Sequence, residues 1–252
     1  MLKQERTKIE DAVETIESVE TGRGVVLVCE HASLRIPEPW QWPASDAWIL
    51  GTHWSFDIGV ADLVRYLCAQ NGCGAVLSRF SRLLIDPNRP PNAPTLIRRI
   101  AEGRILSMND SLTEEERTLR MEKLWVPYHS AARQLIQANG NASIVGMHSF
   151  TRDYEGSSRA MEVGVLFDED QAFGEWAAEW LQKAGLRVAL NEPYSGRNGL
   201  MYSPQFHASE NDRHAIELEF RQDLLSSSQW CSEWFPVLGQ FIAKAASWAA
   251  TP

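Results

Sequence analysis

Short hydrophobic runs alternate with longer amphipathic stretches along this chain, and two of the runs end at a histidine. The apolar run at 25–29 leads directly into Glu30 and His31, and the run at 143–147 leads into His148. Short apolar runs bounded by polar residues are typical of buried strands. Open α/β sheets bind ligands beyond the carboxyl ends of their strands. The pattern therefore predicts two strands whose histidines share one site.

The same pattern predicts strands and helices in alternation over most of the chain. Strands are expected at 24–30, 74–79, 82–86, 143–148, 162–167, 186–190 and 215–220. Helices are expected at 57–71, 112–138, 168–184 and 227–249. The second helix follows a Ser-x-x-Glu pattern from Ser111 to Glu114, which is typical of a capping box. Alternating strands and helices favour a three-layer α/β/α fold.

The chain shows no internal repeat and no low-complexity linker, so a single catalytic α/β domain is expected at 21–252. The polar residues 1–20 are expected to form an arm or a short helix outside it. Two segments, 86–111 and 191–213, are rich in turn-forming residues and are expected to be irregular. Long loops in compact domains are usually functional or disordered.

Composition narrows the function classes. The net charge of −9 argues against nucleic acid and anionic membranes as partners, but it leaves an anionic small molecule open. The four cysteines show neither zinc-finger spacing nor a disulfide pattern. The N-terminus has no signal-peptide core, and no apolar run reaches the ~18 residues of a membrane span. A reduced, soluble, cytoplasmic protein is expected.

The paired histidines His31 and His148 indicate a metal site, although one such histidine alone is more often structural. Catalytic zinc commonly has three protein ligands, for example two histidines and a carboxylate. Asp57 is the candidate carboxylate, but its place before a predicted helix also suits a helix cap. Glu30 is the second choice for the carboxylate ligand. It adjoins His31, and successive side chains of a strand point to opposite faces, so Glu30 would need a bend in the backbone to share the site.

Two further segments carry polar groups suited to a substrate. Asn88 and Arg89 follow an apolar run, and a guanidinium fork matches a carboxylate. The alternative is a proline-flanked turn with a solvated arginine. In 215–222, alternation places Glu217 and Glu219 on one face, where a carboxylate can act as a general base on water. The alternative is an edge strand with one solvated face.

Taken in order, these segments resemble the N-formylglutamate amidohydrolase family over residues 25–225. The residues that carry the resemblance are 29–33 (CEHAS) with 36–37 (IP), His53 and Asp57, 78–82 (SRFSR), 86–90 (DPNRP), 128–129 (YH), 148–151 (HSFT), 163–166 (VGVL), 191–196 (NEPYSG) and 218–224 (LEFRQDL). Each motif is weak alone, and the specificity lies in their number and order.

The resemblance implies a fold similar to zinc carboxypeptidases and aspartoacylases, of the zinc-exopeptidase and phosphorylase/hydrolase-like type. That fold is three-layer α/β/α with a mixed, mostly parallel sheet. It also implies a hydrolase that converts an N-formyl amino acid, most simply N-formyl-L-glutamate, into formate and the free amino acid. One zinc per chain is expected, although histidine and carboxylate ligands also suit other divalent metals. A homo-oligomer is compatible with this assignment.

By position, the resemblance implies the role of each candidate. His31 and His148 match the histidine ligands, Asn88 and Arg89 match the clamp on the substrate carboxylate, and Glu219 matches the acid/base. Further substrate contacts are expected from Arg82, Tyr194 and Arg221. Carboxypeptidase-like proteins place a zinc-binding glutamate three residues after the first histidine, where this chain has Leu34. The acid ligand must come from elsewhere, with Asp57 preferred over Glu30.

Two other functions remain compatible with the sequence. One is a related metallohydrolase that removes a different acyl group or acts on a different amino acid. The other is a non-catalytic small-molecule binding protein on the same fold. The complete set of histidines, the Asn-Arg pair and Glu219 favours the enzyme.

Overall fold

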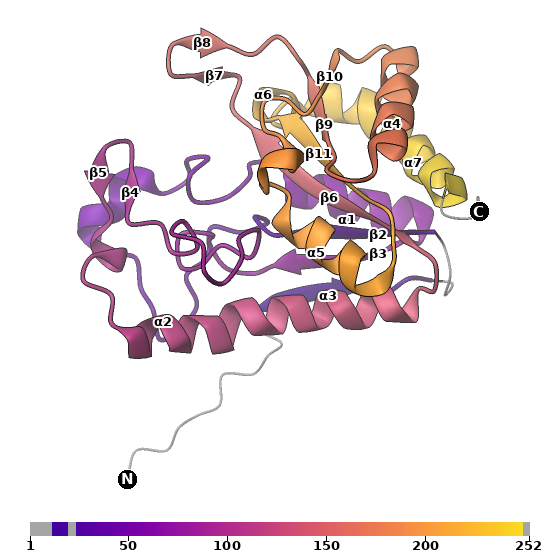
Figure 1. The fold of residues 1–252 in the computed structure, drawn as a ribbon. Coiled ribbons are helices and arrows are strands. Elements are labelled where there is room, and N and C mark those ends of the chain that lie inside the picture. The colour runs from indigo at the N-terminus through magenta and orange to yellow at the C-terminus, as the bar shows by residue number, and fades with distance from the viewer. Residues whose placement is uncertain (1–11, 20–23, 249–252) are drawn as a thin grey trace.

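A seven-stranded mixed sheet forms the centre of the computed structural model, which describes residues 12–19 and 24–248 (Figure 1). The strand order is β1-β3-β2-β6-β11-β9-β10. Neighbours run parallel except at the β1–β3 and β11–β9 pairs, which are antiparallel. The strands are β1 (Val13–Ile16), β2 (Val25–Cys29), β3 (Gly74–Ser78), β6 (Ser143–Phe150), β9 (Val163–Leu166), β10 (Val188–Leu190) and β11 (Ala215–Arg221).

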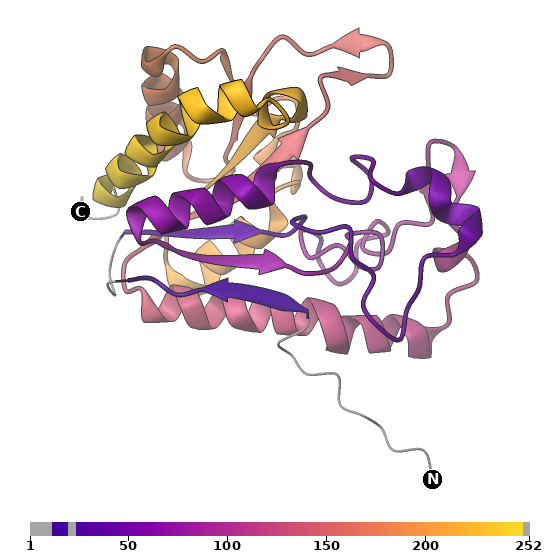
Figure 2. The same cartoon turned by 180° about the vertical axis from the view of Figure 1, so that it is seen from behind.

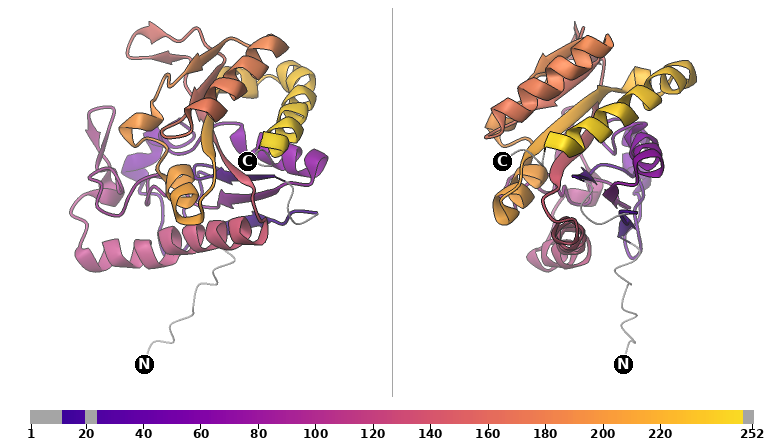
Figure 3. Two further views of the ribbon diagram at one scale, coloured as in Figure 1. Left: turned by 45° about the vertical axis from the view of Figure 1, so that its right-hand side comes forward. Right: turned by 90° about the vertical axis from the view of Figure 1, so that its right-hand side faces the viewer.

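Helices cover both faces of the sheet. On one face lie α1 (Val60–Asn71), α4 (Gln171–Ala184) and α7 (Ser228–Trp248), and Figure 2 shows α1 and α7 in front of it. On the other face lie α3 (Val126–Ala138) and α5 (Tyr202–Asn211). The end-on view in Figure 3 shows these layers. The predicted three-layer α/β/α architecture with a mixed, mostly parallel sheet is confirmed.

Side-chain alternation explains the two cores. In β2 the side chains of Val25, Leu27 and Cys29 enter the core beneath α1 and α7, while Val26 and Val28 enter the core beneath α3. All five are fully buried, as expected for a central strand with helices on both faces. The same alternation in β11 sends Ile216, Leu218 and Phe220 to the first core and its acidic side chains to the opposite face.

The remaining elements are short and lie mainly in connections. They comprise the hairpins β4 (Ile100–Ala101) with β5 (Arg104–Ile105) and β7 (Asp153–Tyr154) with β8 (Ser157–Ser158), the helices α2 (Glu114–Arg120) and α6 (Gln222–Leu225), the 3-10 turns η2 (Ala44–Ile49), η3 (Ser107–Asn109) and η5 (Gly196–Asn198), and the π turn η4 (Met121–Trp125) that joins α2 to α3. The segment 86–111 is therefore mostly irregular, as expected.

Three sequence predictions need correction. Residues 82–86 are buried but form turns rather than a strand, with the amide of Leu84 bonded to the Ser81 carbonyl. The segment 191–213 contains helix α5. Helix α2 is capped by Thr113, whose hydroxyl accepts from the Glu116 amide at 3.2 Å, and not by Ser111.

Part of the polar segment 1–20 joins the sheet. Residues 13–16 form the edge strand β1 rather than a helix, pairing with β3 from Val13 opposite Ser78 to Ile16 opposite Ala75. Residues 1–11 and 20–23 lie outside the described part of the chain. The division into an arm at 1–20 and one domain at 21–252 stays a prediction.

Candidate active site

A cavity of about 290 Å³ lies at the carboxyl ends of β2, β6 and β11. It is the place where an open α/β sheet is expected to bind a ligand. The cavity brings together all the predicted site residues except Arg221; those lining it are His31, Asp57, Arg82, Asn88, Arg89, His148, Tyr194 and Glu219.

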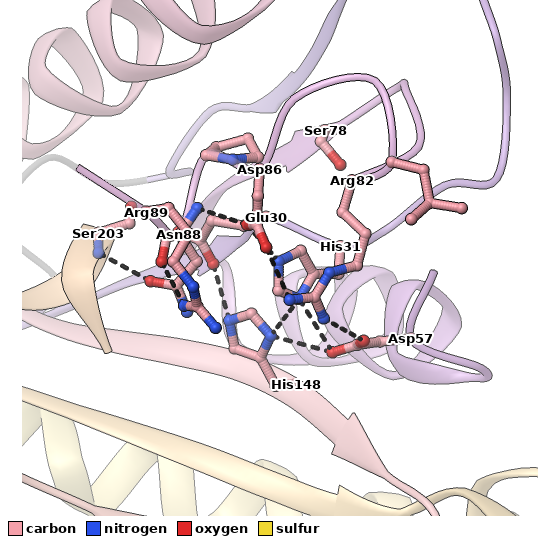
Figure 4. Close-up of polar contacts among 12 residues, drawn as sticks. Glu30, His31, Asp57, Ser78, Arg82, Asp86, Asn88, Arg89, His148 and Ser203 are labelled. Carbon is pink, nitrogen blue, oxygen red and sulfur yellow. Dashed lines mark hydrogen bonds and ion pairs between the residues drawn. The ribbon is translucent and has the colours of Figure 1, made fainter. Parts of the chain in front are cut away.

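Three potential metal-ligand atoms, one each from His31, Asp57 and His148, lie close together (Figure 4). The Nδ1 atoms of the two histidines are 3.0 Å apart. Asp57 Oδ2 lies 2.9 Å from His148 Nδ1 and 3.5 Å from His31 Nδ1. All three side chains are buried. Because a tetrahedral ion with bonds of about 2.0–2.1 Å separates its ligand atoms by roughly 3.3 Å, this spacing suits zinc.

Each imidazole also contacts a carboxylate through its other nitrogen, Nε2. His31 Nε2 lies 2.7 Å from Asp86 Oδ1, and His148 Nε2 lies 2.9 Å from Glu30 Oε2. The hydroxyl of Tyr128, from α3, donates to the other oxygen of Glu30 at 2.9 Å. Carboxylates behind histidine ligands are typical of metal sites, because they fix the tautomer and the ring orientation.

This arrangement is itself evidence for a cation. If each Nε2 donates its hydrogen to a carboxylate, both Nδ1 atoms carry lone pairs, and these face each other and the carboxylate oxygen of Asp57. Three converging acceptors repel one another unless a positive charge lies between them. The donor set therefore fits a divalent metal.

Asp57 faces the histidines rather than capping α1. The residue at the start of that helix is Gly59, with φ 81°, and no side chain caps it. The Asp57 amide donates to the His31 carbonyl at 2.9 Å, and its carboxylate accepts from the Ser149 amide at 3.0 Å. The helix-cap alternative is wrong. Glu30 contacts the back of His148, so it is placed to orient that ligand.

Burial and pairing set the charges of these carboxylates. Burial opposes ionisation of Glu30, but the hydrogen bond from His148 outweighs it and lowers the pKa to about 2. Burial also opposes ionisation of Asp86, yet Arg82 and His31 hold its pKa well below the usual range. Arg82 reaches Asp86 at 2.7 Å and Asp57 at 3.8 Å. The guanidinium of Arg82 is thus already paired with carboxylates of the site.

Glu217 and Glu219 lie on β11 between β6 and β9, so the edge-strand alternative is wrong. Glu219 lies opposite His148 in the parallel register with β6. Its Oε2 is buried without a hydrogen-bond partner among the described residues, and burial raises its pKa well above the usual value. Glu217, in contrast, accepts from the Asn88 amide at 3.2 Å and lies 3.4 Å from His148 Nε2. Of the two acids, Glu219 has the uncommitted oxygen.

Glycines on both neighbouring strands make room for these acids. Gly146 of β6 lies opposite Glu217, and an added Cβ there would be 2.9 Å from Glu217 Cγ. Gly164 of β9 lies opposite Glu219. An added Cβ at Gly164 would be 2.2 Å from the Glu192 carbonyl oxygen and 3.3 Å from Glu219 Cβ. A larger residue at either position would displace its surroundings.

Asn88 and Arg89 differ in how much of their hydrogen-bonding capacity is used. The Asn88 amide donates to Glu217 and to the Leu200 carbonyl at 3.1 Å, and its oxygen accepts from the Ser203 amide at 2.9 Å. Arg89 uses Nη1 on the Asn88 and Leu200 carbonyls, at 2.6 and 3.4 Å. Its other guanidinium hydrogens have no acceptor within the described chain. Arg89 is therefore the freer donor.

Arg221 is engaged outside the cavity. Its guanidinium pairs with Asp223 at 2.7 Å and donates to the carbonyls of residues 159–161. Tyr194 does line the cavity, and the Arg159 guanidinium lies 5.3 Å from its ring centroid.

Sequence reasoning assigned no role to several residues that the fold brings to the site; for Arg98 it weighed only, with Arg99, a contact to a second anionic group against a solvated loop arginine. Asp86 and Tyr128 occur in the quoted motifs, yet nothing local links them to His31 or Glu30. His53, Trp54 and Arg98 line the cavity as well. The signal that pointed to them was the length of the irregular segment 86–111 and the inclusion of His53 among the family motifs.

The fold and the cavity define an α/β enzyme whose active site lies at the carboxyl end of a mixed sheet. The family model of N-formylglutamate amidohydrolase matches residues 23–226. The chain therefore belongs to the N-formylglutamate amidohydrolase family, and it is a hydrolase acting on amide bonds rather than a non-catalytic binding protein.

Two solved structures resemble the whole chain. A gene product from Agrobacterium tumefaciens is 31% identical with a TM-score of 0.87, covering 96% of this chain and 97% of its own. The N-formylglutamate amidohydrolase from Ralstonia eutropha JMP134 is 17% identical with a TM-score of 0.71, covering 95% and 98%. The second likeness shows the fold. A comparison with curated proteins gives no match.

Among the helices described, none is long and apolar enough to cross a membrane. The four cysteines are all free in the structure.

Proposed function

We propose that this protein is a zinc-dependent amidohydrolase that converts N-formyl-L-glutamate into formate and L-glutamate. The observation that supports it most is the convergence of His31, Asp57 and His148, whose imidazoles are backed by carboxylates, beside the uncommitted carboxylate of Glu219. A zinc ion held by these three ligands would polarise the formyl carbonyl and make a water acidic enough to attack it.

The remaining work falls to side chains of the cavity. Glu219, whose raised pKa the positive charge of a bound metal would lower, takes a proton from the attacking water and returns it to the nitrogen as the carbon–nitrogen bond breaks, which gives formate and a free amine. Glu30 and Asp86 keep the two imidazoles in the tautomer that leaves Nδ1 free. Arg82 compensates the charges of Asp57 and Asp86.

Arg89 is proposed to bind the α-carboxylate of the substrate, which fixes the formyl group over the three ligands. Asn88 supports it indirectly, because its amide holds the Leu200 carbonyl that Arg89 also contacts. Tyr194 contributes a wall of the cavity. A cytoplasmic location, a homo-oligomer, and action on a different N-acyl amino acid stay predictions from the sequence.

Formate release from a panel of N-formyl amino acids tests the reaction. We expect release from at least one N-formyl amino acid, fastest with N-formyl-L-glutamate. A chelator should abolish the release and added zinc should restore it, because the proposed mechanism needs the cation that His31, Asp57 and His148 would hold. Release that survives complete removal of the metal would contradict the zinc mechanism. Absence of release from the whole zinc-loaded panel would contradict deformylation.

Replacement of Arg89 by alanine tests the carboxylate clamp. We expect KM to rise roughly 10–100-fold, since a hydrogen bond to a charged group is worth about 1.5–3 kcal/mol. The effect on kcat should be smaller if ground and transition states are bound alike. Steady-state kinetics measure both. Arg221→Ala is the comparison, because Arg221 lies outside the cavity and its loss should leave KM near the wild-type value.

A further inference from the structure

Arg98 is a cavity arginine that lacks an anionic partner. Its side chain lines the cavity, and within the described chain no carboxylate or carbonyl oxygen accepts a hydrogen bond from its guanidinium. The guanidinium lies over the Trp54 ring, 5.1 Å from the centroid. The two other arginines of the cavity differ, because Arg82 pairs with Asp86 and Arg89 bonds backbone carbonyls.

The backbone at Arg98 is anchored although it belongs to an irregular segment. Asn109 donates its amide to the Arg98 carbonyl at 2.7 Å and to the Leu83 carbonyl at 2.8 Å. The Asn109 oxygen in turn accepts from the buried Arg120 at 2.6 Å. Ile97, next to Arg98, is 8% exposed. Arg98 is thus held at the cavity by its own backbone and by Trp54.

Its charge is poorly compensated. Burial, and then the positive charge of Arg82, lower the pKa of Arg98, and the opposing effect of Asp86 does not outweigh them. A partly desolvated guanidinium stacked on an indole still offers all its N–H donors at its edge. An incoming carboxylate would relieve the repulsion and take up those donors.

We propose that Arg98 binds the side-chain carboxylate of the substrate, and that it thereby selects N-formyl amino acids with acidic side chains. This inference rests on the proposed deformylation and deepens it. Arg89 serves the α-carboxylate, which every amino acid has, whereas Arg98 discriminates among side chains. A neutral side chain leaves the Arg98 guanidinium unpaired inside the cavity, and such unpaired polar groups are a strong source of rejection.

The aromatic surface around Arg98 fits the same substrate. Trp54 and Tyr154 line the cavity, and His53 lies between them, with ring centroids 5.1 Å from Trp54 and 6.3 Å from Tyr154. The methylene groups of a glutamate side chain can pack on such rings while its carboxylate reaches the cation. The wall and the arginine together define a subsite for a short acidic chain.

The test compares N-formyl-L-glutamate with N-formyl-L-glutamine, which has nearly the same shape and no charge, on the zinc-loaded enzyme. We expect wild type to favour the glutamate substrate in kcat/KM by roughly 10–100-fold, the range for a hydrogen bond to a charged group. Arg98→Gln should bring this ratio close to one, and Arg98→Lys should keep part of it. Arg99→Ala is the matched control, because Arg99 pairs with the exposed Asp110 and is absent from the cavity lining.

A binding measurement separates failure of Arg98 from failure of the reaction. Calorimetry with L-glutamate and L-glutamine needs no turnover, and wild type should bind glutamate more tightly, with the difference lost in Arg98→Gln. Circular dichroism checks that the variants are folded. If formate is released but the Arg98→Gln ratio matches wild type, the role of Arg98 is overturned while the proposed function stands. If no formate is released, the calorimetry still tests Arg98. A preference for L-glutamate over L-glutamine that is the same in Arg98→Gln as in wild type would then overturn the role of Arg98.

Discussion

Replacement of Glu219 by glutamine is expected to lower kcat by about 10²–10⁴-fold, the usual contribution of a positioned acid/base. Glutamine keeps the shape of the side chain but cannot take the proton of the attacking water. The zinc content should stay at one per chain, because Glu219 is not among the three converging ligands. Steady-state kinetics and metal analysis of the same preparation measure the two quantities.

Glu217→Gln is the matched control for this experiment. It lies two residues away on the same strand and face, and its carboxylate accepts from the Asn88 amide and lies 3.4 Å from His148 Nε2, contacts that a glutamine oxygen can keep. Its kcat should therefore fall much less. A Glu219→Gln enzyme with wild-type turnover, or a Glu217→Gln enzyme that is the more damaged of the two, would remove Glu219 from the acid/base role.

Replacement of His148 by alanine is expected to abolish both zinc binding and formate release. The histidine supplies one of three ligands, and its loss also removes an imidazole that contacts the buried carboxylates of Glu30 and Asp57. Zinc bound after exhaustive dialysis should fall from about one per chain to near zero. Metal analysis gives the content, and a competitive chelator gives the affinity.

Glu30→Gln distinguishes the effect of losing a metal ligand from the effect of losing the residue that orients that ligand. Glu30 touches the far side of His148, so its replacement should weaken zinc about 10–100-fold without removing a ligand. Thermal unfolding of both variants without zinc shows whether the fold persists. If His148→Ala keeps stoichiometric zinc at wild-type affinity, the metal centre lies elsewhere.

The strands and the helices that end at the site were predictable because their signals are local. The apolar runs before His31 and His148 mark buried strands, and alternation in β11 correctly places Glu217 and Glu219 on one face. The same logic failed at residues 82–86, because burial in turns and burial in a strand give the same apolar run. It also missed α5, where polar residues and Pro204 interrupt the helical periodicity.

The contacts that complete the site depend on packing between distant segments. Asp86 reaches His31 across 55 residues, and Tyr128 reaches Glu30 across 98. Arg98 contacts the Trp54 ring, and the backbone of Arg98 is in turn bonded by Asn109. No periodicity or residue spacing in the sequence predicts these long-range contacts. The family resemblance identified the motifs, but the fold is needed to show which of them are in contact.

The glycines on the two strands beside β11 limit how far the stability of the central sheet can be raised. A glycine in a strand costs roughly 0.5–1 kcal/mol relative to alanine, and Gly146 and Gly164 lie in strands that are buried throughout. Alanine, the usual remedy, would collide with Glu217 at one position and with the Glu192 carbonyl at the other. The space that an alanine side chain would need is thus already occupied, by Pro204 and Glu217 beside Gly146 and by the Glu192 carbonyl beside Gly164. Engineering for heat resistance would have to begin away from these two positions, since a replacement there would displace the neighbours of the site acids.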